Sequence, residues 1–286
     1  VLLGQLERID AVKDELGLDF ECEAIDVRYD PRRRTTYAAE LHRLRGRKGV
    51  AMEDAVRLLK STTYFAPMMV RMGDADGYLG GVSHHYPDIV RPCLHTIGPD
   101  PDSHRIVGMY MMTVNGQLMF IGDATINIYP DARTLAEIAV QTAKVARRFG
   151  VQPKVAMLSF SNFGTSGELR TDRIEEAIAI ARELDPDLVI DGPMQADTAL
   201  VPEIQKDYPF MAFDGPANVL ICPNLSAANI AYKLLQRIAG AEMTGPILEG
   251  LSKPAHVLQR GDSVRDVVHM AAICAVDAQR QTKQRL

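Results

Sequence analysis

Residues 245–268, GPILEGLSKPAHVLQRGDSVRDVV, combine an interrupted helix, an extended segment and the start of a new helix. The Gly-Pro pair at the beginning predicts the end of a helix, and the apolar run after it favours an extended chain. Asp262 or Ser263 suits the N-cap of a final helix that reaches about residue 280. Asp266 follows in the first turn, where a carboxylate stabilises the positive helix end.

A candidate anion site lies immediately before this final helix. Arg260 precedes Gly261 at the mouth of the turn, so a cation faces the N-terminus of the helix. Guanidinium groups and helix N-termini both bind phosphates and carboxylates. An ordinary capped helix start has the same composition, and the local pattern alone favours that simpler interpretation.

Further from this stretch, strands and helices alternate through the second half of the chain. Strands are predicted at 154–160, 188–191 and 219–222, and helices at 171–184 and 225–239. This alternation indicates a parallel sheet with helices on both faces, in which ligands lie beyond the carboxyl ends of the strands. The prediction is an α/β protein with two lobes and three-layer α/β/α architecture. Residues 1–149 plus 250–286 form the first lobe, and residues 150–249 form the second.

The first half of the chain carries fewer distinct signals. Asn115-Gly116 between the apolar runs 106–114 and 117–121 predicts a β-hairpin. Residues 135–149 carry apolar side chains at helical spacing and predict an amphipathic helix. The apolar run at 66–72 predicts a strand that ends at a Gly-rich turn.

Composition excludes several classes of protein. The 286 residues have a formal net charge of −5, which argues against nucleic-acid binding. The sequence contains no run of 18 apolar residues, so it predicts no transmembrane helix. The four cysteines are far apart in sequence, which predicts buried thiols in a reducing, cytoplasmic compartment rather than disulfides or a zinc site. We expect no metal site: His84 and His85 lack a third ligand at suitable spacing, and the carboxylates of 191–197 flank a Pro turn.

Four segments resemble one family. They are DIVRPC at 88–93, SFSNFGTS at 159–166, ANVLICPNLSAANIAYK at 217–233 and QRGDSVRD at 259–266. Together they resemble the phosphate acetyl/butyryltransferase family, whose architecture is similar to that of isocitrate and isopropylmalate dehydrogenases. The segment KPAHVLQR at 253–260, followed by SVRD, resembles more specifically the phosphotransacetylase-like C-terminal domain of bacterial NADP-dependent malic enzymes.

The resemblance implies a site for acetyl-CoA or phosphate in a cleft between the lobes. Arg91 and Arg260 would bind phosphate, Asp266 would lie near the CoA thiol, and Lys233 would meet the CoA phosphates. The implied ligand-binding residues are Arg91, Ser161, Asn162, Gly164, Thr165, Asn229, Tyr232, Lys233 and Arg260. Gln259 departs from the family pattern, in which a small polar residue precedes the arginine, so no residue is assigned a catalytic role.

Three functional hypotheses follow. The first is a regulatory and oligomerisation domain that binds acetyl-CoA or CoA and controls an N-terminal malic-enzyme domain, an oxidoreductase that converts malate to pyruvate. On this hypothesis the domain itself holds no cofactor, NADP and a divalent metal belong to the N-terminal part, and the chain forms a homodimer or a higher oligomer. The second is an active phosphate acetyl- or butyryltransferase. The third is a structural dimerisation domain.

Overall fold

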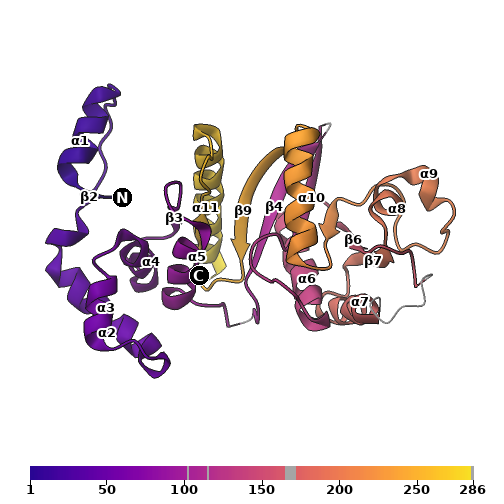
Figure 1. Cartoon of the computed structure of the whole chain (residues 1–286), viewed down its shortest axis with the longest axis horizontal. Coiled ribbons are helices and arrows are strands. Elements are labelled where there is room, and N and C mark those ends of the chain that lie inside the picture. The colour runs from indigo at the N-terminus through magenta and orange to yellow at the C-terminus, as the bar shows by residue number, and fades with distance from the viewer. Residues whose placement is uncertain (102, 115, 165–171, 285–286) are drawn as a thin grey trace. The chain divides into compact units, whose positions relative to one another are not determined.

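The computed structural model describes residues 1–101, 103–114, 116–164 and 172–284, and the chain divides into two compact units (Figure 1). Val1–Asp100 and Leu251–Leu286 form the first unit, and Pro101–Gly250 form the second. The first unit combines both ends of the chain, as the predicted first lobe does. The predicted boundary near residue 150 instead falls inside the second unit. The reason is that β5 (Gln117–Gly122) pairs with β8 (Val219–Ile221), which places the hairpin in the second unit's sheet.

The second unit contains a six-stranded mixed sheet with the order β7-β6-β8-β5-β4-β9. Its remaining strands are β4 (Val107–Val114), β6 (Lys154–Leu158), β7 (Val189–Met194) and β9 (Glu242–Glu249). Strands β6, β7 and β8 run parallel, as predicted. Strand β5 also pairs in parallel with β8, whereas β4 is antiparallel to both β5 and β9. The predicted hairpin is therefore confirmed. The Gly245-Pro246 pair lies within β9 and does not end a helix, because β9 pairs along β4.

Helices cover both faces of this sheet. They are α6 (Ala132–Arg148), α7 (Asp172–Leu184), α8 (Ala196–Leu200), α9 (Pro202–Gln205) and α10 (Leu225–Ile238). Ile121 of β5 shares a core cluster with Tyr232 of α10. The neighbouring Phe120 packs against Phe149 at the end of α6, with ring centroids 5.9 Å apart. Because consecutive strand residues point to opposite faces, α10 and α6 lie on opposite sides, and the predicted three-layer α/β/α fold is confirmed.

The first unit is mainly helical. Its helices are α1 (Leu6–Glu15), α2 (Pro31–Arg45), α3 (Met52–Leu58), α4 (Thr62–Met72), α5 (Tyr86–Thr96) and α11 (Val264–Gln284), with short 3-10 turns at Val27–Tyr29 and Gly46–Lys48. Two small parallel sheets pair β1 (Leu2–Leu3) with β2 (Ala24–Ile25) and β3 (Tyr78–Gly80) with β10 (Ala255–Val257). Within the described residues, no helix is both long enough and apolar enough to cross a membrane.

The strand predicted at 66–72 is wrong, because these residues belong to helix α4. The Ser61 hydroxyl caps the helix by accepting the Thr63 backbone N–H, and Gly73 ends it in the left-handed conformation. Phe65 and Met68 are fully buried in a core shared with Tyr37 of α2. A short apolar run has no clear period, so burial of this face decided between strand and helix.

Candidate functional site

The parallel pair β3 and β10 brings two loops to the same end of the first unit. Ala255 pairs with Tyr78 and Val257 with Gly80, and the pairing continues when the Leu258 N–H donates to the Gly80 carbonyl at 2.9 Å. Residues 81–85 follow β3 and lead into α5, while residues 258–263 follow β10 and lead into α11. Carboxyl ends of parallel strands commonly carry ligand sites.

Gly81 permits the close approach of these two loops. Its φ is +130°, and a Cβ at this position would lie 2.4 Å from the Leu258 carbonyl oxygen. Only glycine adopts this conformation without strain, and no other side chain fits against that carbonyl. The sequence alone does not reveal this contact, because Leu258 lies 177 residues further along the chain, in the loop after β10.

Arg260 lies in the second loop, as predicted, and its side chain is exposed. Its Nη2 donates to the Ser83 carbonyl at 3.2 Å, which ties the guanidinium to the loop after β3. The Gln259 N–H donates to Asp262 Oδ2 at 2.7 Å and fixes the turn around Arg260. Burial, together with the nearby Asp266 charge, raises the pKa of Asp262.

Asp266 closes a capping box at the start of α11. Its Oδ2 accepts the Ser263 backbone N–H at 2.8 Å and the Ser263 hydroxyl at 2.7 Å, and the Asp266 N–H donates to the Ser263 hydroxyl at 3.3 Å. This reciprocal arrangement stabilises the first turn of a helix. Among the described residues, Asp266 Oδ1 has no hydrogen-bond partner, so one carboxylate oxygen remains available.

Arg91 lies on α5 and is exposed, in the same unit as Arg260. It belongs to a cationic cluster that the sequence analysis missed. The Tyr64 hydroxyl and His95 Nδ1 form a hydrogen bond of 2.9 Å. Burial lowers the pKa of His95, and the positive charges of Arg45, Arg91 and Lys48 lower it further.

Arg45 is the member of this cluster that most needs an additional partner. Its Nε is buried, and it has no hydrogen-bond partner among the described residues. A buried N–H without an acceptor destabilises a protein unless a ligand or water supplies one. The only sequence signal was a short basic segment around residues 43–48, which resembled an ordinary solvated surface.

The predicted loop residues Ser161, Asn162 and Gly164 follow β6 in the second unit, while Thr165 lies outside the described residues. Asn162 is engaged in the fold: its Oδ1 accepts the Gln195 N–H at 2.7 Å, and its Nδ2 donates to the Tyr208 hydroxyl at 3.0 Å. Ser161 is buried. Gly164 adopts a left-handed conformation with a φ of +74°.

Helix α10 carries the remaining predicted residues. Tyr232 is buried and stacks on Tyr110, with ring centroids 4.3 Å apart, so its ring is part of the core. Asn229 is half-buried, and Lys233 is exposed with its Nζ 5.6 Å from the Tyr232 ring centroid. The Asn224 side chain caps the helix by accepting the Ala227 N–H at 3.0 Å.

Two other features of the site region concern metals. Among the described residues, no three His, Cys, Asp or Glu side chains are arranged to hold a metal ion. Asp191 accepts the backbone N–H groups of Gly192 and Ala212, and Asp197 accepts that of Thr198. The carboxylates of the 191–197 loop therefore satisfy backbone groups of the turn.

Comparison with known proteins assigns the chain to one family. The family model described as phosphate acetyl/butaryl transferase matches residues 1–275. Phosphate acetyltransferase from Corynebacterium glutamicum is 38% identical over 97% of this chain and 84% of its own length. The one from Helicobacter pylori is also 38% identical, but the chain spans only 54% of its length. A phosphotransacetylase crystal structure from Streptococcus pyogenes is 38% identical with a TM-score of 0.91, covering 97% of this chain and 85% of that one.

These relatives are named phosphate acetyltransferase or phosphotransacetylase, so the prediction of a malic-enzyme C-terminal domain is wrong. The predictions that depended on it are also wrong: a non-catalytic regulatory domain, an oxidoreductase fragment, an association with NADP and an N-terminal malic-enzyme partner. The error came from the weight given to Gln259. One side chain beside Arg260 carries less information than similarity over 97% of the chain.

Proposed function

The chain belongs to the phosphate acetyl/butaryl transferase family, and we propose that it transfers an acetyl group between coenzyme A and inorganic phosphate. Acetyl-CoA and phosphate would give acetyl phosphate and CoA. The observation that carries the proposal is the 38% identity, over 97% of the chain, to a protein named phosphate acetyltransferase.

The reaction defines what the site must do. A phosphate oxygen attacks the thioester carbonyl carbon, and the carbonyl electrons move onto its oxygen. The tetrahedral intermediate then collapses, the carbon–sulfur bond breaks, and the CoA sulfur leaves as a thiolate that takes up a proton. Catalysis requires cations that hold the phosphate against the carbonyl and donors that stabilise the developing oxyanion.

Arg260 is our candidate for holding the phosphate. Its guanidinium is exposed, and the hydrogen bond from Nη2 to the Ser83 carbonyl fixes its direction. A guanidinium has five N–H donors, so further donors remain for an oxyanion. Asp266, whose Oδ1 has no partner among the described residues, is our candidate for the carboxylate near the CoA thiol.

The cationic cluster of the first unit supports binding of the anionic end of CoA. The charges of Arg45, Arg91 and Lys48 lower the pKa of His95, and within the described part of the chain the buried Arg45 Nε lacks an acceptor. A phosphate group of CoA would supply that acceptor through a charge-assisted hydrogen bond. We expect no bound cofactor besides the CoA substrate. We also propose a cytoplasmic location.

The test is an assay of acetyl phosphate formation with the purified chain, supported by arsenolysis. We expect Arg260→Ala to lower kcat/KM by about 10²–10³-fold, the usual loss when one oxyanion donor is removed. Arg57→Ala is the matched control, since Arg57 is an exposed arginine of the same unit that pairs with Asp54 on α3. Absence of turnover in the wild-type chain, or equal activity of the two variants, would contradict the proposal.

Gln259 provides a second variant in the same assay. Its side chain is larger than the small polar residue that the family pattern has before the arginine. If Gln259 crowds the thioester, Gln259→Ser raises kcat with acetyl-CoA and leaves the KM for phosphate unchanged. No change in kcat would show that the larger side chain is accommodated.

A further inference from the structure

Two short strands of the first unit each have an open edge. Among the described residues, β1 pairs only with β2, and β3 pairs only with β10. The Tyr78 N–H donates to the Pro254 carbonyl at 3.0 Å, and the Gly80 carbonyl accepts the Leu258 N–H at 2.9 Å, both on the side of β10. Because alternate residues of a strand direct their backbone groups to opposite edges, the N–H and carbonyl of Leu79 face the open edge. Such an edge is a template for another strand.

A cavity lies along the open edge of β3. Its volume is about 740 Å³, and Gly77 and Leu79 both line it. Val1, which directly precedes β1, also lines it, so the cavity extends to the neighbourhood of the second open strand. The lining from helix α11 consists of Ala271, Cys274, Ala275, Ala278 and Gln279. Most of these side chains are small, so the helix leaves room for the side chains of an added strand.

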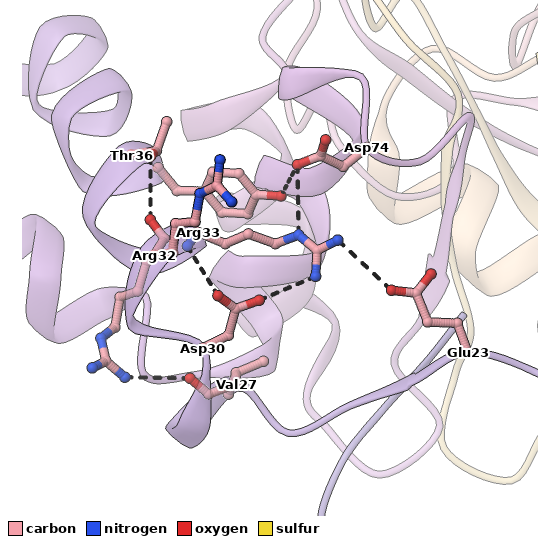
Figure 2. Close-up of polar contacts among 9 residues, drawn as sticks. Glu23, Val27, Asp30, Arg32, Arg33, Thr36 and Asp74 are labelled. Carbon is pink, nitrogen blue, oxygen red and sulfur yellow. Dashed lines mark hydrogen bonds and ion pairs between the residues drawn. The ribbon is translucent and has the colours of Figure 1, made fainter.

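An ion-pair network ties together the segments that carry the two open edges. As Figure 2 shows, Arg33 of α2 lies among three carboxylates, those of Asp30, Glu23 and Asp74. Glu23 directly precedes β2, and its Oε1 lies 3.7 Å from Arg33 Nη2. Asp74 lies between α4 and β3, where it accepts the Tyr37 hydroxyl and is 3.9 Å from Arg33 Nε. One guanidinium therefore connects the β2 segment to the β3 segment without any added strand.

The charge of the cavity favours a basic partner. Asp76 lines the cavity and is exposed, and it forms no ion pair or hydrogen bond with another described residue. Within the part of the chain that the structure describes, no Lys or Arg lines this cavity. A lysine, an arginine or an N-terminal amine of a bound molecule would therefore be attracted to Asp76.

We propose that this cavity is a docking site for an extended peptide of a partner protein, which adds a strand to the open edge of β3. Main-chain hydrogen bonds to Leu79 supply affinity, and alternate side chains of the peptide select for small apolar residues against α11. A basic group at one end meets Asp76. The proposal is independent of the transferase reaction, because no residue that lines this cavity is assigned to phosphate or CoA.

The probe is a synthetic peptide of about eight residues, in which valine and threonine alternate after an N-terminal lysine. With the purified chain we expect saturable binding in calorimetry, with Kd below about 1 mM, and at least about tenfold slower hydrogen exchange of the Leu79 amide. A peptide with methylated backbone nitrogens keeps the side chains but cannot donate to the strand edge, so it should not bind. Replacing the lysine of the probe by glutamate should weaken binding by about two- to fivefold.

Two variants of α11 locate the binding. Ala275→Phe fills the cavity from the helix and should weaken peptide binding by at least about tenfold. The matched control is Ala272→Phe, since Ala272 is an exposed alanine of the same helix that does not line the cavity. This variant should bind the peptide as the wild type does.

Three results would overturn the proposal. They are no binding at peptide concentrations up to about 1 mM, equal binding of the methylated peptide, and equal weakening by the two phenylalanine substitutions. Sedimentation without peptide provides a further test: dimers that Ala275→Phe disrupts and Ala272→Phe preserves would show that a second copy occupies the edge, and the partner peptide would be wrong. Because these measurements need no turnover, failure of the proposed function would leave their outcome unaffected.

Discussion

Variants of the capping box at the start of α11 separate the contribution of Asp266 to stability from its contribution to catalysis. Asp266 Oδ2 accepts two hydrogen bonds from Ser263, while Oδ1 has no partner among the described residues. Ser263→Ala removes the hydroxyl that completes the box but leaves the carboxylate in place. Asp266→Ala opens the same box and also removes the carboxylate.

The magnitude follows from the contacts. Loss of an N-terminal cap costs about 1 kcal/mol of stability, within a range of about 0.5–2 kcal/mol. We therefore expect both variants to lower the free energy of unfolding by about 1 kcal/mol. If Asp266 also handles the proton of the CoA thiol, Asp266→Ala loses a further factor of about 10²–10⁴ in kcat, the usual contribution of general acid–base catalysis. Ser263→Ala should keep kcat near the wild-type value.

Urea unfolding followed by circular dichroism measures the stability term, and amide hydrogen exchange in the first turn of α11 localises it. Initial rates of acetyl phosphate formation measure the chemical term. Unchanged stability in Ser263→Ala would refute the capping argument. Equal losses of kcat in the two variants would show that Asp266 acts only through the helix start.

Three further predictions concern a loop contact, a histidine and the cysteines. Gly81→Ala should destabilise the chain by at least about 1–3 kcal/mol in urea unfolding, because its Cβ would meet the Leu258 carbonyl at 2.4 Å and its φ of +130° would be strained; an unchanged midpoint would contradict the close approach. The pKa of His95 is lowered in the folded state, so its contribution to stability should fall as pH drops below about 6.5 and stop falling below the folded pKa. Urea titrations at about pH 7.5 and about pH 5.5 should show a smaller loss for His95→Gln than for wild type, and an equal loss would argue against the shift. A thiol reagent should label exposed Cys22 quickly and the three buried cysteines only after unfolding, and fast labelling of more than one thiol would contradict the packing.

The sequence alone determined the features that depend on neighbouring residues. The β4–β5 hairpin and the helix start at Ser263 and Asp266 both follow from hydrogen bonds within a few positions of the chain. The amphipathic pattern of α6 and the strand–helix alternation likewise indicated a three-layer α/β/α fold. Such signals are local, because turns and caps are satisfied by residues close in sequence.

The features that depend on contacts between distant segments were decided only by the tertiary structure. Residues 66–72 became helical because their apolar side chains are buried against α2, which no local period revealed. Arg260 meets the Ser83 carbonyl, and Gly81 meets the Leu258 carbonyl, because β3 and β10 pair across about 177 residues. The physical reason is that parallel pairing and helix packing set the distances between remote segments. The sequence thus supplies the chemical groups of this site, while the fold determines which groups they contact.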